Sequence, residues 1–137
     1  MKYNLEESRK KIQAEIEANK ILVAELIDNG DFLDDDGYPT DDALTIIEKW
    51  HWDDSKGWFK FINGIWHLAS CGWGEGLEKH EWNDNDVYRY HISTAGWSGN
   101  ESIIRAMQEN YMLWSITWVQ SRRGGHFIFE DVELKND

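Results

Sequence analysis

Cysteine and long apolar runs are scarce in this sequence of 137 residues. Cys71 is the one cysteine, so no disulfide can form within the chain, and no second cysteine suggests a zinc or redox motif. No apolar run is long enough to span a bilayer, and the first residues lack the apolar stretch of a secretory signal. We therefore expect a cytoplasmic protein that makes no membrane contact.

Positive charge is also scarce, with 14 Lys and Arg against 26 Asp and Glu and a net charge of −12. This balance argues against direct binding to nucleic acid or to an anionic membrane. Between Asp31 and Asp54 there are nine carboxylates and one base, and a second acidic cluster runs from Glu75 to Asp86. Such runs commonly form a solvated face. The alternative is a surface that imitates DNA phosphates or docks on a basic protein, and its candidate residues are Asp34, Asp35, Asp36, Asp41, Asp42, Asp53 and Asp54.

Tryptophan is abundant, and nine residues of this type are spread from residue 50 to residue 118. An indole buries a large area, and its N–H needs a hydrogen-bond partner when it is enclosed. A domain this small is not expected to enclose all nine. We therefore expect some of them to line a pocket or an interface, because large aromatic side chains are enriched at binding hot spots.

The order of helical and alternating patterns predicts one α+β domain over residues 1–137, with a long N-terminal helix, short helices and a small, largely antiparallel sheet of about four strands. Residues 4–29 form the long helix, with an apolar stripe that includes Ile12, Ile16 and Val23, and Gly30 ends it. The N-terminal helix over residues 1–30 either packs on the domain or pairs with a copy of itself.

Further elements follow from local patterns. Thr40 is expected to cap a short helix, and a second helix follows until the glycines of "CGWGEG" break it. The segments "LEKHEW" and "VYRYHIST" alternate like strands across the turn "NDND". In "YMLWSITWVQ" the period-two spacing of Trp114, Ile116 and Trp118 predicts another strand, which returns through "RRGG" to a strand containing Phe127 and Phe129.

The segment "GWSGNE" follows a predicted strand and precedes a predicted helix over residues 101–109. Ser98 lies three residues before Glu101, which is the spacing of a capping box. A nucleophile elbow occupies a similar position, but the acid and the histidine that a hydrolase needs do not follow convincingly. None of the five histidines has metal-ligand spacing. We therefore expect no enzyme activity, no metal and no cofactor.

An anion-binding nest is a further interpretation of the same segment, because a helix N-terminus offers unpaired N–H groups and partial positive charge. The turn "SRRGGH" supplies the concentrated basic charge of the second half. If the two segments meet, they form a pocket for a small anion or a nucleotide-like ligand. Otherwise the arginines lie on an exposed hairpin. The candidate ligand-binding residues are Trp97, Ser98, Gly99, Asn100, Arg122, Arg123 and His126.

The two blocks "GWSGNESIIRAMQEN" and "SRRGGHFIFE" resemble a signature of small acidic phage and prophage proteins. The resemblance covers roughly Thr94 to Glu130 and leaves out the N-terminal helix and the acidic loop. It implies an accessory role in the cytoplasm of a host cell, and it assigns no functional residue.

The leading hypothesis is a non-enzymatic binding protein that inhibits a host protein acting in defence or on nucleic acid. One alternative is a receptor or sponge for a nucleotide-like anion. Another is a structural or assembly protein of the phage that forms a homo-oligomer through its N-terminal helix.

Overall fold

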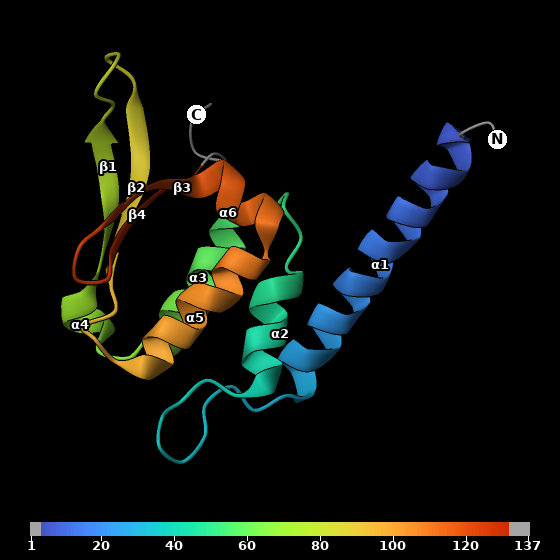
Figure 1. Cartoon of the computed structure of the whole chain (residues 1–137), viewed down its shortest axis with the longest axis horizontal. Helices are drawn as coiled ribbons and strands as arrows, with labels where there is room; N and C mark the ends of the chain where they lie inside the picture. Colours follow the sequence, from blue (N-terminus) through green and yellow to red (C-terminus); the bar gives the residue numbers. More distant parts are fainter. Residues whose placement is uncertain (1–3, 132–137) are drawn as a thin grey trace.

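The computed structural model describes residues 4–131 of the chain and confirms an α+β architecture (Figure 1). In sequence order its elements are α1 (Leu5–Asn29), α2 (Asp41–Lys49), α3 (Ser55–Ile65), α4 (Ala69–Gly72), β1 (Trp73–Lys79), β2 (Asp86–Ser93), α5 (Ser98–Glu109), α6 (Tyr111–Thr117), β3 (Trp118–Arg122) and β4 (His126–Asp131).

The four strands form one antiparallel sheet in the order β1-β2-β4-β3. Helices α3 and α5 contribute apolar side chains that pack with those of β2 and β4 to form the core. Phe59 of α3 stacks on Tyr90 of β2 at a ring distance of 4.0 Å, and Phe129 of β4 completes this aromatic contact. The core is thus continuous between the sheet and the helices that cover it.

Helix α1 confirms the prediction for residues 4–29 and shows why it is so long. The Asn4 side chain accepts hydrogen bonds from the backbone N–H groups of Glu6 and Glu7, and the N–H of Gly30 bonds the Leu26 carbonyl at the other end. Val23 is its one buried residue, and α2 is its main packing partner. The N-terminal half of α1 extends away from the body of the protein (Figure 1).

Two local predictions are wrong. The segment around Trp114 and Ile116 is helix α6, because the Asn110 side chain caps it at Leu113 N–H and anchors it to the Ile47 and Trp50 carbonyls. The second helix is not continuous up to "CGWGEG", because α3 ends at Ile65; the glycines do end the short helix α4, at Gly72. The following strand also starts earlier than "LEKHEW", since Trp73 to Gly76 are the first residues of β1 and pair with β2.

The "RRGG" turn is confirmed, since Gly124 and Gly125 both have positive φ between β3 and β4. The expectation that the domain does not enclose all nine tryptophans is also confirmed. Trp58 and Trp66 are buried, whereas Trp52, Trp82 and Trp118 are exposed. Within residues 4–131, no helix combines the length and the hydropathy that crossing a membrane requires.

Candidate binding surfaces

The start of α5 differs from the predicted capping box. Helix α5 begins at Ser98, its N-cap is Trp97, and no side chain caps it. The Ser98 hydroxyl instead lies 3.0 Å from the Tyr38 hydroxyl, in the loop between α1 and α2. The capping prediction is therefore wrong, because a partner distant in sequence engages the hydroxyl that the local pattern assigned to the backbone.

Trp97 packs closely on its own helix start and on two neighbouring segments. A Cβ atom at Gly99 would overlap the Trp97 ring, so a side chain at that position would displace the indole. The same ring stacks on His67 at 4.2 Å and contacts Tyr38 at 4.6 Å. The protein itself therefore occupies much of the indole surface that we expected a ligand to use.

Asn100 has a structural role that the sequence did not reveal. Its side chain is 1% exposed, and it both accepts from the His67 backbone N–H and donates to the His67 carbonyl, each at 3.0 Å. This pair of hydrogen bonds fastens α5 to the segment between α3 and α4, where Leu68 adopts a positive φ. Both polar groups of the Asn100 amide are already engaged.

The basic turn packs against the link between β2 and α5. The Gly125 carbonyl accepts a hydrogen bond from Thr94 N–H at 3.0 Å, and a Cβ atom at Gly125 would overlap the Thr94 hydroxyl. Arg122 donates a long hydrogen bond of 3.4 Å to Gln120. Across the part of the chain that the structure describes, no hydrogen bond joins Arg122 or Arg123 to the start of α5. The shared anion pocket stays a prediction.

His126 follows this turn and pairs with Ser93 across the sheet. Burial lowers the pKa of His126, and the neighbouring His91 ring and Arg122 guanidinium lower it further. The charged imidazolium is therefore disfavoured here. This reduces the capacity of His126 to attract an anion at neutral pH.

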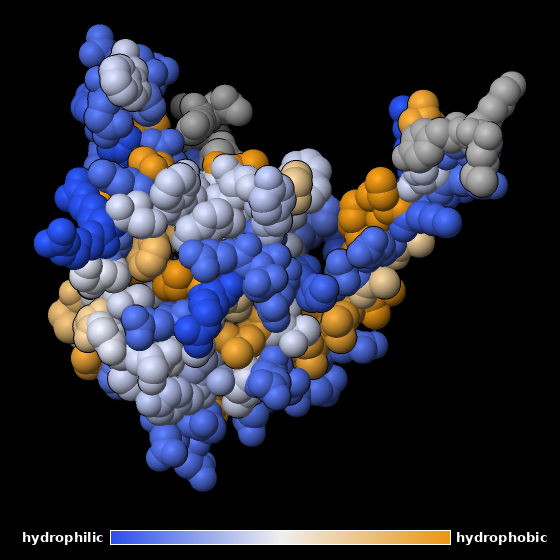
Figure 2. Space-filling model, in the orientation of Figure 1, coloured by the Kyte–Doolittle hydropathy of each residue, from blue (hydrophilic) through white to orange (hydrophobic). Residues whose placement is uncertain are grey.

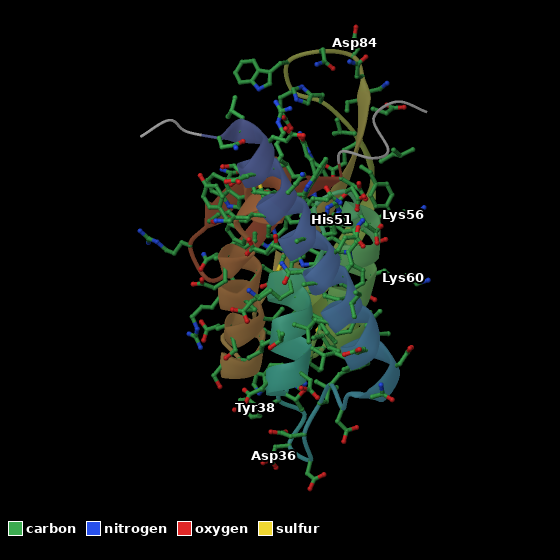
Figure 3. The ribbon with its side chains drawn as sticks, turned by 90° about the vertical axis from the view of Figure 1, so that its right-hand side faces the viewer. Asp36, Tyr38, His51, Lys56, Lys60 and Asp84 are labelled. Carbon is green, nitrogen blue, oxygen red and sulfur yellow. The ribbon has the colours of Figure 1, made fainter. Side chains whose placement is uncertain are left out.

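The predicted acidic residues lie in two groups at opposite ends of α2. Asp34, Asp35 and Asp36 are exposed in the loop before α2, and Asp41 and Asp42 form its first turn (Figure 3). Asp53 and Asp54 follow its C-terminal end, about 13 Å away by helix rise.

Part of this acidity is engaged within the chain. Asp54 accepts hydrogen bonds from the Gly57 N–H and the Trp50 indole. Asp53 pairs with His51 at 2.5 Å, and this hydrogen bond lowers the pKa of the Asp53 carboxyl. In the loop group, Asp34 likewise accepts hydrogen bonds from the Asp36 and Tyr38 N–H groups. The side chains of both groups are nevertheless exposed, apart from the half-buried Asp42.

The hairpin between β1 and β2 presents a tryptophan that the sequence analysis did not single out. Trp82 is 88% exposed and lies in the turn that joins the two strands (Figure 1). Three short hydrogen bonds fix the turn: His80 N–H to the Asn85 carbonyl, Trp82 N–H to His80 Nδ1, and Asn85 N–H to Asn83 Oδ1. The backbone of the turn is thus hydrogen-bonded within the hairpin, while the indole faces solvent.

A buried arginine fastens this hairpin to the rest of the sheet. Arg89 of β2 is 6% exposed, and its Nη2 lies 2.8 Å from both Glu81 and Glu130. Its Nη1 also contacts Glu81, and Glu78 at 3.5 Å. The hydrogen bond from Arg89 lowers the pKa of Glu81 to about 2. The same carboxylate raises the pKa of Arg89.

Arg89, Glu78, Glu81 and Glu130 together form what we call the Arg89 cluster. Two of its carboxylates lie close to a histidine, in a group of residue types that can bind metal ions. His80, Glu81 and Glu130 place ligand atoms within 4.8 Å of one another. However, the Arg89 guanidinium already binds both carboxylates, and His80 Nδ1 accepts from Trp82 N–H. The positive charge at this position is supplied by arginine, so these residues give no argument for a metal site.

Acid sensitivity tests the Arg89 cluster. Because the folded pKa of Glu81 lies below its ordinary value of 4.5, the ion pair stabilises the fold above that value and is lost as the pH falls towards about 2. We expect Arg89→Met to flatten the decline in urea stability between about pH 5 and pH 2 relative to the native chain. Lys79→Met is the control, because its ion pair with Asp86 is solvent-exposed. Identical pH profiles of stability for the native chain and Arg89→Met would contradict a stabilising ion pair between Arg89 and Glu81.

A cleft of about 280 Å³ lies between α3 and the first two strands, lined by Lys56, Lys60, Asn63, Glu75, Tyr88 and Tyr90. Glu75 accepts from the Trp73 indole and from the Tyr88 hydroxyl, both at 2.7 Å, and this raises the pKa of Tyr88 to about 12. The two lysines extend from α3 towards solvent (Figure 3). The cleft's polar floor is therefore largely satisfied by the protein.

Comparison with protein-family models, with curated proteins and with solved structures gives no significant match to this chain.

Local sequence patterns contained only weak signals for Trp82 and Arg89. Trp82 borders the predicted "NDND" turn, where a large aromatic side chain has no strand neighbour to cover it. Arg89 lies between two tyrosines in an alternating strand, where a charged residue reads as solvent-facing. Its burial depends on Glu130, which is 41 residues away in sequence.

Proposed function

We propose that this chain is a non-catalytic binding protein that inhibits a basic, nucleic-acid-acting protein of a host cell. The observation that carries the proposal is Trp82, 88% exposed at the end of an acidic hairpin. Between residues 73 and 86 the hairpin contains five carboxylates and one base, Lys79. An indole surrounded by negative charge suits a partner that has an apolar pocket within a basic surface.

The energetics favour an anchor of this kind. Tryptophan is enriched among interface residues whose truncation costs about 2 kcal/mol or more, and such residues fill pockets on the partner. Negative charge around the anchor accelerates encounter with a basic partner and disfavours acidic ones. The exposed aspartates Asp34, Asp35 and Asp36 add to the negative field at the opposite end of the molecule (Figure 3).

Rigidity of the hairpin supports the same function. Arg89 joins Glu81, the residue before the anchor, to Glu130 on β4, so the tip is braced before a partner arrives. A preformed binding element loses less conformational entropy on association than a flexible one. The Arg89 cluster thus contributes to binding without touching the partner.

The non-catalytic part of the proposal rests on the hydroxyl at the start of α5. The Ser98 Oγ forms a hydrogen bond with the Tyr38 hydroxyl, whereas a nucleophilic serine is paired with an adjacent general base such as histidine. The nucleotide-sponge alternative has less support, because Asn100 and Trp97 are already engaged by His67. It stays a prediction. The host partner follows from the resemblance to phage proteins predicted for the segment from Thr94 to Glu130, and it shares the status of that prediction.

A site-specific cross-link tests the proposal. A photo-cross-linking aromatic amino acid replaces Trp82 in one variant and Leu77 in another, because Leu77 is 66% exposed on the same hairpin. In bacterial cells, we expect the label at position 82 to capture a basic protein that the label at position 77 does not. The purified partner is then expected to release DNA when the native chain is added. A partner whose DNA binding is unchanged, or equal labelling from both positions, would contradict the proposal.

A further inference from the structure

The projecting half of α1 lacks the packing that stabilises a helix. The helix has 25 residues, and its half-buried and buried positions are Ser8, Ile16, Asn19, Val23 and Leu26; all but Ser8 fall in the half that meets α2. A helical segment shorter than about 12–15 residues is marginal in water without tertiary contacts. The residues before Ile16 form such a segment, and they extend beyond the body (Figure 1).

The apolar stripe of α1 nevertheless continues into this projecting half. Leu5 and Ile12, with the charged Arg9 between them, precede Ile16 at alternating steps of three and four residues. They therefore lie on the helix face that packs against α2 further along the helix. Leu5 is 60% exposed and Ile12 is 58% exposed. Apolar side chains are visible along the projecting helix in Figure 2. This stripe has the spacing of a helix–helix contact surface.

A second wall, which mixes large apolar and charged side chains, faces the stripe where α1 leaves the body. The cleft between them has a volume of about 220 Å³, and it is lined on the α1 side by Ile16 and Asn19. On the body side it includes the exposed large side chains of Trp52, Tyr111 and Met112, together with the charged residues Glu48, Lys49 and Glu109. The two walls diverge with distance from α2. The projecting half of α1, which we call the arm, therefore forms an open groove together with the body.

Charge identifies the occupant of this groove. Within residues 4–20 there are four acids (Glu6, Glu7, Glu15 and Glu17) and four bases (Arg9, Lys10, Lys11 and Lys20), giving zero net charge in a chain of −12. Two copies of so acidic a chain repel one another over most of their surfaces. The arm is a segment where two copies can approach each other without this electrostatic repulsion.

We infer that two copies of this chain pair through their α1 arms in an antiparallel, two-fold symmetric dimer. Each arm lies along the stripe of the other and enters the groove beside Trp52 and Tyr111 of the second copy. The heptad spacing then places Ile12 beside Ile16 of the second copy and Glu6 beside Lys20 of the second copy. A two-fold axis repeats each contact, so one self-complementary helix supplies both halves of the interface.

This inference is independent of the proposed function, because the β1–β2 hairpin and the α1 arm lie on opposite sides of the molecule (Figure 1). A dimer built in this way leaves both Trp82 anchors accessible. It fits a bivalent inhibitor, but its existence does not depend on any partner.

The mass of the protein in solution tests the dimer. Light scattering on the native chain is expected to give twice the chain mass of 16.2 kDa. Ile12→Lys is expected to give a monomer with an unchanged near-UV circular dichroism spectrum, because the side chain is outside the core. Ala18→Lys is the matched control, since Ala18 is an exposed residue of α1 on another face. It is expected to remain dimeric.

A charge exchange tests the orientation of the two helices. Glu6→Lys and Lys20→Glu are each expected to weaken the dimer, and the double variant is expected to restore it, as measured by the concentration dependence of the mass. A native chain that is monomeric up to about 100 µM, well above typical dissociation constants of specific interfaces, would overturn the inference. So would dissociation by Ala18→Lys. An Ile12→Lys protein that stays dimeric would place the interface elsewhere and also reject it.

Discussion

Trp82→Ala is expected to weaken binding to the cross-linked partner by roughly 30-fold or more, the factor that corresponds to a hot-spot loss of about 2 kcal/mol. The indole is 88% exposed in the free chain, so its loss removes little that holds the fold together. The unfolding midpoint should therefore remain within error of the native value. The measurement is a dissociation constant from calorimetry or biolayer interferometry at fixed ionic strength.

Trp118→Ala is the matched control for this experiment, because Trp118 is also an exposed tryptophan but lies on β3. It is expected to bind the partner with native affinity. The affinity of the native chain should also fall as salt is added, since part of the attraction comes from exposed charge. Equal losses for Trp82→Ala and Trp118→Ala would show that the hairpin tip is not the anchor.

Asn100→Ala is expected to lower the free energy of unfolding by about 2–3 kcal/mol, because two hydrogen bonds are lost and a buried amide leaves an unfilled space. The His67 backbone N–H and carbonyl both lose their partner, and they lie next to a residue that already adopts a positive φ. We expect the melting temperature to fall by roughly 10 °C. Chemical denaturation of the native and variant chains gives the free-energy difference directly.

Ser98→Ala is the control, because its hydroxyl makes an exposed contact with Tyr38 and does not cap the helix. It is expected to cost less than about 1 kcal/mol. This pair of variants separates a structural helix start from a ligand site. If Asn100→Ala left the stability unchanged, the amide would not be a structural bridge, and a binding role for the segment would regain support.

Predictions based on long or strongly local signals were correct. The long helix predicted over residues 4–29 begins at Leu5 and ends where Gly30 indicates, because the periodic pattern is long and the stop signal acts within a few residues. The glycine turn between β3 and β4 was predictable for the same reason, as it needs two residues at positive φ. The α+β class followed from the order of these elements.

Predictions that depended on competition between distant segments failed. Trp114 and Ile116 have strand-like spacing, yet Asn110 converts their segment into a helix by bonding the end of α2. Ser98 has the spacing of a cap, yet Tyr38 occupies its hydroxyl. In both cases a side chain from another part of the chain supplies an interaction that no local pattern reports.

The sequence by itself determined the class of the fold, the sign of the charge and the surplus of tryptophan. These are properties of composition and short-range order, and they do not change with the path of the chain. Only the tertiary structure decided which of these residues is available to a partner. Burial and exposure depend on contacts between residues far apart in sequence, such as the ion pair that braces Arg89 with Glu130 and the packing that leaves Trp82 uncovered.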